Sequence, residues 1–145
     1  MPDRLIAAIV IIAAGIGLYL AFTRWQLWRA RHIPLDVAGR DPGKYLILYF
    51  TSPTCAVCKS VQEPTLRTVE SKLGDKLQVI KVDTTERMDL AQRWQIMTVP
   101  TTLIFDGTDQ LRLQNLGLAR EGKLLKQLTD LGCTPSGALA TQGSV

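Results

Sequence analysis

The chain has 145 residues and a formal net charge of +4. This length leaves room for one compact domain of about 100 residues. Residues 1–44 carry six Lys or Arg against three Asp or Glu, and residues 45–145 carry eleven against ten, so the positive charge is concentrated near the N-terminus. Positive charge placed there fits binding to lipid headgroups better than binding to nucleic acid. The chain has three cysteines and one histidine, which argues against a disulfide scaffold and against a Cys/His zinc site.

The first predicted element is an uncharged apolar segment, LIAAIVIIAAGIGLYLAFT, at residues 5–23. As a helix, this segment would be long enough to cross the hydrocarbon layer of a bilayer, which is about 30 Å thick. Aromatic and basic side chains gather at its C-terminal end, as at a membrane exit: Tyr19, Arg24, Trp25, Trp28, Arg29 and Arg31. The alternative, a cleaved signal peptide, would have a shorter apolar core and a small-residue cleavage site. We therefore expect residues 1–33 to form a single-pass anchor whose residues 5–23 contact the lipid bilayer.

A short linker is expected at residues 34–44, because PLDVAGRDPG mixes helix breakers with small polar residues. The domain then begins with YLILYF at residues 45–50, an apolar run that suits a strand covered on both faces of a parallel or mixed sheet. A polar turn leads into a helix that ends at residues 74–75. From spacings of three and four positions, we predict that its buried face consists of Cys58, Val61, Thr65, Val69 and Leu73.

The remaining elements alternate along the chain. Strands are predicted at residues 77–82, 101–105 and 110–116, and helices at residues 86–94 and 120–131. Three aromatic residues in the predicted strands and helices have apolar neighbours and are assigned to the core: Phe50, Trp94 and Phe105. The predicted order β-α-β-α-β-β-α indicates an α/β domain over residues 45–133, followed by a disordered tail at residues 134–145.

The strongest chemical signal is a pair of cysteines, Cys55 and Cys58, where a strand and a short turn lead into a helix. At a helix N-terminus, unpaired N–H groups and the helix dipole favour the thiolate of the first cysteine. The spacing lets the second sulfur form a disulfide with the first while it faces the core. A zinc ribbon would need a second pair, and only Cys133 remains. We therefore predict a redox-active dithiol that requires no metal and no other cofactor.

Four sequence features within residues 45–131 occur in a familiar order: YFTSPTCAVCK, KVDTTE, TVPTTLIFDG, and Gly117 followed by an amphipathic helix. Together they resemble the thioredoxin family. The resemblance implies a thioredoxin-like fold, with a central mixed sheet of about four strands flanked by helices, preceded here by one transmembrane helix.

The resemblance also implies roles for individual residues. Cys55 would attack a disulfide in a protein substrate, and Cys58 would resolve the mixed disulfide. The substrate would contact Ala56 and Val57 between the cysteines, and Val99 with a cis Pro100 on the opposite side. The implied partners are a disulfide-containing protein and an upstream thiol reductant.

The chain departs from the family pattern in four places. Thr54 precedes the first cysteine where the family commonly has Trp, and Ala56-Val57 replaces Gly-Pro between the cysteines. Tyr49 stands where many members carry a buried acid. Pro64 follows Cys58 by six residues, one more than usual.

A second class of function remains open besides catalysis. The domain could be a thioredoxin-like binding module at the membrane, or it could carry a soft metal such as Cu(I) on its two thiolates. Further soft ligands would have to come from Met88 and Met97.

The charges that flank the apolar segment predict which side of the membrane the domain occupies. Arg4 precedes the segment and is partly offset by Asp3, whereas four arginines follow it: Arg24, Arg29, Arg31 and Arg40. The positive-inside rule therefore places the domain in the cytoplasm. After mild reduction of intact cells, a thiol reagent that cannot cross membranes should label Cys55 only once the cells are lysed. Strong labelling before lysis would show that the domain faces outward.

Overall fold

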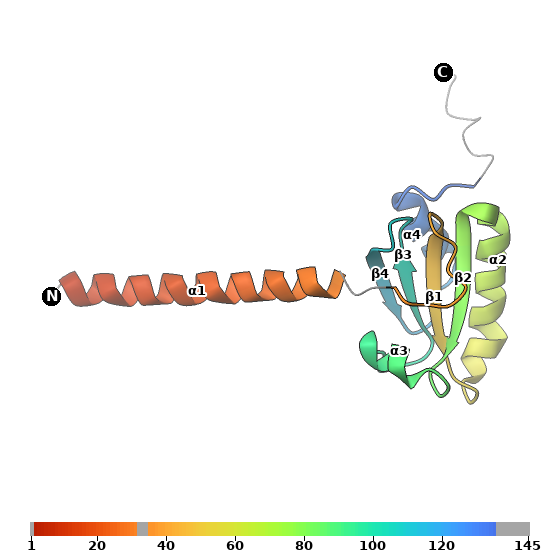
Figure 1. Cartoon of the computed structure of the whole chain (residues 1–145), viewed down its shortest axis with the longest axis horizontal. Helices are drawn as coiled ribbons and strands as arrows, with labels where there is room; N and C mark the ends of the chain where they lie inside the picture. Colours follow the sequence, from red (N-terminus) through yellow and green to blue (C-terminus); the bar gives the residue numbers. More distant parts are fainter. Residues whose placement is uncertain (1, 32–34, 136–145) are drawn as a thin grey trace, which may run out of the picture. The chain divides into compact units, whose positions relative to one another are not determined.

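The computed structural model describes residues 2–31 and 35–135, and the chain divides into two compact units between residues 35 and 36 (Figure 1). The first unit contains helix α1 (Pro2–Arg31), in which the segment Asp3–Trp25 is long and apolar enough to cross a membrane. A signal sequence near an N-terminus has the same properties, so the segment is a candidate span. Residues 32–34 of the predicted anchor and linker, and the predicted tail from residue 136 onward, lie outside the described residues.

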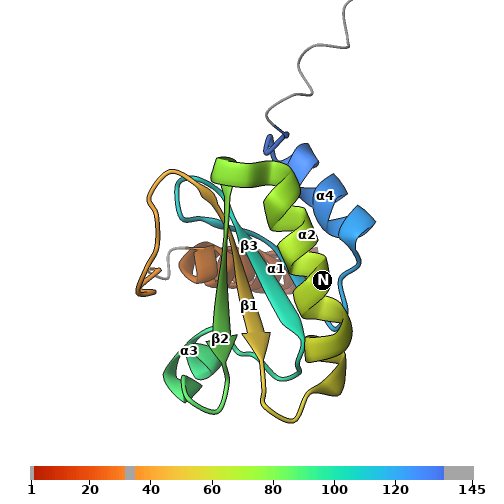
Figure 2. The ribbon, with the colours of Figure 1, turned by 90° about the vertical axis from the view of Figure 1, so that its right-hand side faces the viewer.

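The second unit is built on a four-stranded sheet in the order β2-β1-β3-β4. Its strands are β1 (Tyr45–Thr51), β2 (Leu77–Asp83), β3 (Thr101–Phe105) and β4 (Leu111–Leu116). Strand β1 is parallel to β2 and antiparallel to β3, and β3 is antiparallel to β4. Helices α2 (Glu63–Leu73) and α4 (Glu121–Asp130) lie side by side on one face, and α3 (Met88–Arg93) lies on the other (Figure 2). The predicted fold class and order of elements are confirmed.

Strand β1 runs through the centre of the core, and its residues from 46 to 51 are all buried. Ile47 and Tyr49 belong to the cluster formed with α2 and α4, and the alternation of a strand directs Phe50 to the other face. On β3, Phe105 packs edge-to-face against Trp94, with ring centroids 5.2 Å apart. Phe50, Trp94 and Phe105 are all buried, which confirms their assignment to the core.

The helix after the cysteines begins with a π turn, η1 (Cys58–Gln62), in which the Glu63 N–H bonds to the Cys58 carbonyl oxygen. A π turn holds one residue more than an α turn, so it accommodates the extra residue before Pro64. Pro64 follows directly as the second residue of α2, inside a helical run that is continuous from residue 56. Its missing N–H thus falls beside the π turn, where the regular α-helical hydrogen bonds are already interrupted.

The wider turn changes which side chains face the core. The prediction that Val61 and Thr65 are buried was wrong: Val61 is 41% exposed, and Gln62 and Leu66 are buried instead. From Val69 onward the predicted face is correct, because the regular α-helical period applies again.

The segment predicted as a linker contacts the domain along much of residues 36–44, coloured orange in Figure 2. The Arg40 guanidinium is buried and donates to Asp109 Oδ1 at 2.8 Å and to the Lys44 carbonyl at 2.7 Å. The Gln78 side chain bonds to two further backbone groups of this segment, at 2.6 and 2.9 Å. These contacts hold the segment against the start of β1 and β2.

We predict that Arg40→Ala lowers the free energy of unfolding by about 2 kcal/mol, because hydrogen bonds from a charged group are lost and the partly buried Lys44 carbonyl loses this donor. Lys44→Ala is the matched control, since the Lys44 side chain forms an exposed ion pair with Asp41 and its removal should matter far less. Urea unfolding of both full-length variants measures the difference. Equal stabilities would show that the Arg40 contacts contribute nothing.

Candidate active site

The register of the sheet brings several chain segments together at one edge. Thr101, the first residue of β3, pairs with Phe50 near the end of β1 and with Leu116 at the end of β4. The Gly117 N–H donates to the Pro100 carbonyl at 2.8 Å. The segment after β1, which contains both cysteines, therefore lies at the same edge as the segments before β3 and after β4.

Cys55 and Cys58 form a disulfide, with their Cα atoms 5.3 Å apart. The Cys58 backbone N–H lies 3.3 Å from Cys55 Sγ, so this sulfur occupies the position of an acceptor at a helix N-terminus. Cys58 is fully buried, whereas Cys55 is partly exposed. Once the bond is reduced, this environment favours the thiolate at Cys55.

The other residues that the resemblance assigns to the site lie at the same edge of the sheet. Ala56 and Val57 are exposed in the first helical turn. Pro100 is buried at the start of β3, and the peptide bond that joins Val99 to it is cis. The partly buried Val99 packs against the cluster that contains Cys58.

Tyr49 belongs to the same buried cluster as Cys58, and its hydroxyl has no hydrogen-bond partner among the described residues. Burial raises the pKa of this phenol, and the negative charge of Glu63 adds to the effect. Tyr49 therefore stays protonated at neutral pH and cannot act there as a base. Glu63 and Lys81 form an ion pair of 2.7 Å and line a pocket of about 210 Å³ together with Tyr49.

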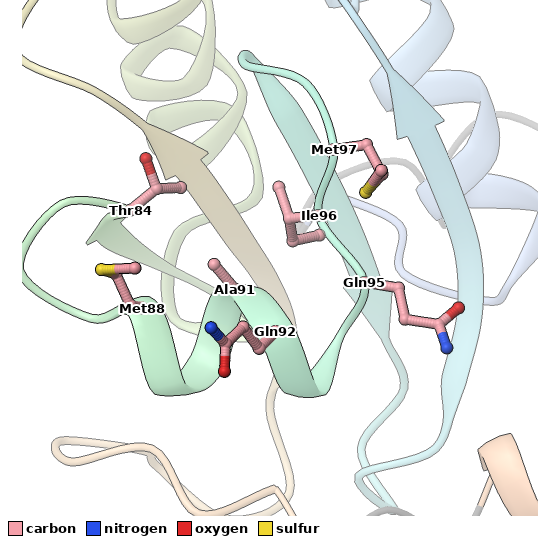
Figure 3. A pocket seen from close by; sticks show the side chains of 7 residues that line it. All are labelled: Thr84, Met88, Ala91, Gln92, Gln95, Ile96 and Met97. Atoms are coloured by element: carbon pink, nitrogen blue, oxygen red, sulfur yellow. The ribbon is translucent and has the colours of Figure 1, made fainter.

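An open groove of about 690 Å³ adjoins this edge of the sheet. It is lined by Thr84, Met88, Ala91, Gln92, Gln95, Ile96 and Met97. Figure 3 shows Met88 and Met97 at its two ends, with Ala91 and Ile96 between them. Thr84 lies beside the end of β1, because its N–H donates to the Thr51 carbonyl at 2.9 Å. Met97 is 89% exposed and lies three residues before Pro100.

The sequence analysis missed one residue near the cysteines, Gln62. Its side-chain Oε1 accepts from the Ala119 N–H at 2.9 Å, and its Nε2 donates to the Ala119 carbonyl at 3.1 Å. The available signal was the extra residue before Pro64, which changes the register of the helix. Its partner is 57 residues away, and no local pattern specifies that contact.

Comparison with known sequences identifies the family. The Thioredoxin family model matches residues 36–130 of the chain. The chain belongs to the thioredoxin family. The match includes both cysteines, Val99 with Pro100, and Gln62.

Individual relatives agree with this assignment. Thioredoxin Y, a chloroplastic protein of Oryza sativa subsp. japonica, is 33% identical over 105 residues, which cover 68% of this chain and 62% of the rice protein. Thioredoxin of Bacillus subtilis is 34% identical over 55 residues, which cover 38% of this chain and 52% of the bacterial protein. The chain thus spans less than two thirds of the length of either relative.

Solved thioredoxin structures resemble the fold. Thioredoxin-2 of a malaria parasite aligns with a TM-score of 0.58 and 16% identity, covering 63% of this chain and 86% of that structure. The germline-specific thioredoxin Deadhead of Drosophila melanogaster aligns with a TM-score of 0.55 and 25% identity, covering 61% and 82%. These alignments confirm the thioredoxin-like fold.

We predict that alkylation of the reduced protein at mildly acidic pH modifies Cys55 first, because it is a partly exposed thiol at the helix N-terminus. Cys58 should react slowly because it is buried. Cys133 should also react slowly, because burial raises the pKa of its thiol and shields the sulfur. Mass spectrometry of peptides after short exposure to iodoacetamide measures the three rates. Equal labelling of Cys55 and Cys58 would contradict the proposed difference between the two thiols.

Proposed function

We propose that this chain is a membrane-tethered thiol–disulfide oxidoreductase that reduces or exchanges protein disulfides through Cys55 and Cys58. The observation that carries the proposal is the disulfide between a partly exposed Cys55 and a buried Cys58 at the start of a helix. Membership of the thioredoxin family supports the same chemistry.

In the reductive direction, the Cys55 thiolate attacks one sulfur of a substrate disulfide. The substrate S–S bond breaks, a substrate thiolate leaves, and Cys55 is joined to the other substrate sulfur. Cys58 then loses its proton and attacks Cys55 Sγ, which releases the second substrate thiolate. The substrate gains two electrons, its thiolates take up protons from solvent, and the enzyme is left with the Cys55–Cys58 disulfide. An upstream thiol reductant restores the dithiol.

An extended segment of the substrate would lie across the exposed end of the sheet. The backbone of Val99 next to Pro100 offers hydrogen bonds of the kind that a neighbouring strand makes. Exposed Ala56 and Val57 would contact the substrate on the other side of its disulfide.

Helix α1 would serve as the membrane anchor, with its apolar segment in contact with lipid and the domain on the cytoplasmic side. The uncharged length of residues 5–23 and the arginines that follow it support this arrangement. In this scheme residues 1–33 form the anchor, residues 34–44 the connection, residues 45–133 the catalytic domain and residues 134–145 a tail.

The test is reduction of insulin disulfides by the full-length protein in detergent, with dithiothreitol as the reductant. The wild type should accelerate reduction, and Cys55→Ser should abolish the acceleration because no nucleophile remains. Cys58→Ser should instead form mixed disulfides that cannot resolve, which non-reducing electrophoresis detects as covalent adducts.

The same preparations separate this function from its alternatives. Titration with Cu(I) tests the soft-metal carrier, for which tight binding by wild type and loss in Cys55→Ser would be expected. Wild-type protein that neither reduces insulin nor forms adducts as Cys58→Ser would favour a binding module without catalysis.

A further inference from the structure

Gln62 is a polar side chain in a fully buried position directly after the dithiol. It belongs to η1 (Cys58–Gln62), whose extra residue turns Gln62 toward the core where an apolar residue would be expected. Burial of an amide side chain is unfavourable unless its polar atoms are hydrogen-bonded. Here both polar atoms of Gln62 are paired, and both partners belong to Ala119.

Ala119 lies in the segment between β4 and α4, outside regular secondary structure. The residue is itself fully buried, so water does not satisfy its backbone N–H and carbonyl. Gln62 bonds to both groups, as a neighbouring strand would. The contact therefore ties residues 117–119 to the π turn that begins at Cys58.

The same segment is also tied to the start of β3. Gly117 leaves β4 with φ of +80°, a conformation that glycine adopts at low cost, and its N–H bonds to the Pro100 carbonyl. Two sets of hydrogen bonds thus connect residues 117–119 to the dithiol turn and to Pro100. Between the two ends of this segment, the Leu118 side chain is 37% exposed at the same edge of the sheet.

We propose that Gln62 is a positioning residue that holds residues 117–119 beside the dithiol, so that Leu118 forms part of the surface that receives a protein substrate. The proposal rests on the proposed function, because it assigns this surface to the substrate of the Cys55–Cys58 dithiol. Gln62 acts through Ala119 and takes no part in the chemistry. It should therefore affect large substrates, which reach Leu118, more than small ones.

The test variant is Gln62→Met, which keeps the length of the side chain and removes both hydrogen bonds. Gln127→Met is the matched control, because Gln127 also makes two side-chain amide bonds, to Asn115 at 2.9 and 3.0 Å, which join β4 to α4. Both variants of the full-length protein are compared with wild type. Gln62→Glu, compared at mildly acidic pH, is the second variant if Gln62→Met does not fold. A protonated carboxyl can still accept from the Ala119 N–H and donate to the Ala119 carbonyl, whereas an ionised one would place a negative charge against that carbonyl.

The first readout is hydrogen–deuterium exchange, which does not depend on activity. Gln62→Met should accelerate exchange of the amides at residues 117–119 by about tenfold, whereas Gln127→Met should leave them near the wild-type rate. Gln62→Glu should show a smaller acceleration at mildly acidic pH, where its carboxyl is protonated and keeps both hydrogen bonds. Unchanged exchange, or equal acceleration in Gln127→Met, would overturn the positioning role whether or not the protein reduces disulfides.

The second readout compares a protein disulfide with a small one. In Gln62→Met, the KM for insulin should rise by about tenfold with little change in kcat, while the rate with a small aromatic disulfide stays at the wild-type value. Equal losses with both substrates would show a merely structural role, and an unchanged KM would remove Leu118 from the substrate surface. If the wild type reduces neither substrate, the proposed function and the substrate surface both fail, and exchange alone decides whether Gln62 holds the segment.

Discussion

Strand β1 is hydrogen-bonded to a neighbour along each edge and buried on both faces, and the arrangement of the dithiol site depends on this strand. Its register with β2 and β3 determines which strand ends lie beside the turn that carries the cysteines. Because side chains alternate along a strand, a shift of one residue would exchange the two buried faces. The two faces pack against different partners, because Ile47 and Tyr49 belong to the cluster with α2 and α4 and Phe50 lies on the other face. This difference favours one register, and with it the position of Cys55 relative to Pro100.

The helix that follows β1 shows how a local irregularity can serve a site. The π turn after Cys58 accommodates one extra residue, and its consequence is a buried amide where an apolar side chain would otherwise pack. The unfavourable burial of Gln62 is offset by two hydrogen bonds to a segment that has no strand partner at that point. Helix register and the position of the segment after β4 are thus coupled through one side chain.

Tyr49 gives the interior beside Cys58 a different character from that of family members with an acid at this position. A buried phenol with a raised pKa is neutral at physiological pH, so it does not bring a negative charge near the cysteines. Its hydroxyl lacks a partner among the described residues and borders the pocket that also holds the Glu63–Lys81 ion pair. The Glu63 and Lys81 side chains are both more exposed than Tyr49.

The sequence by itself determined the order of strands and helices, the core positions of Phe50 and Phe105, and the dithiol at a strand–helix junction. These properties depend on periodicity and on neighbours within a few residues, which composition and spacing record directly. The tertiary structure decided the partner of Gln62, that the Tyr49 hydroxyl has no hydrogen-bond partner among the described residues, and that residues 36–44 pack against the domain. Each of these depends on contacts between residues far apart in the chain, such as Gln62 with Ala119 or Arg40 with Asp109, 57 and 69 positions apart. Such contacts exist only after the sheet has brought the segments together, and no local pattern encodes them.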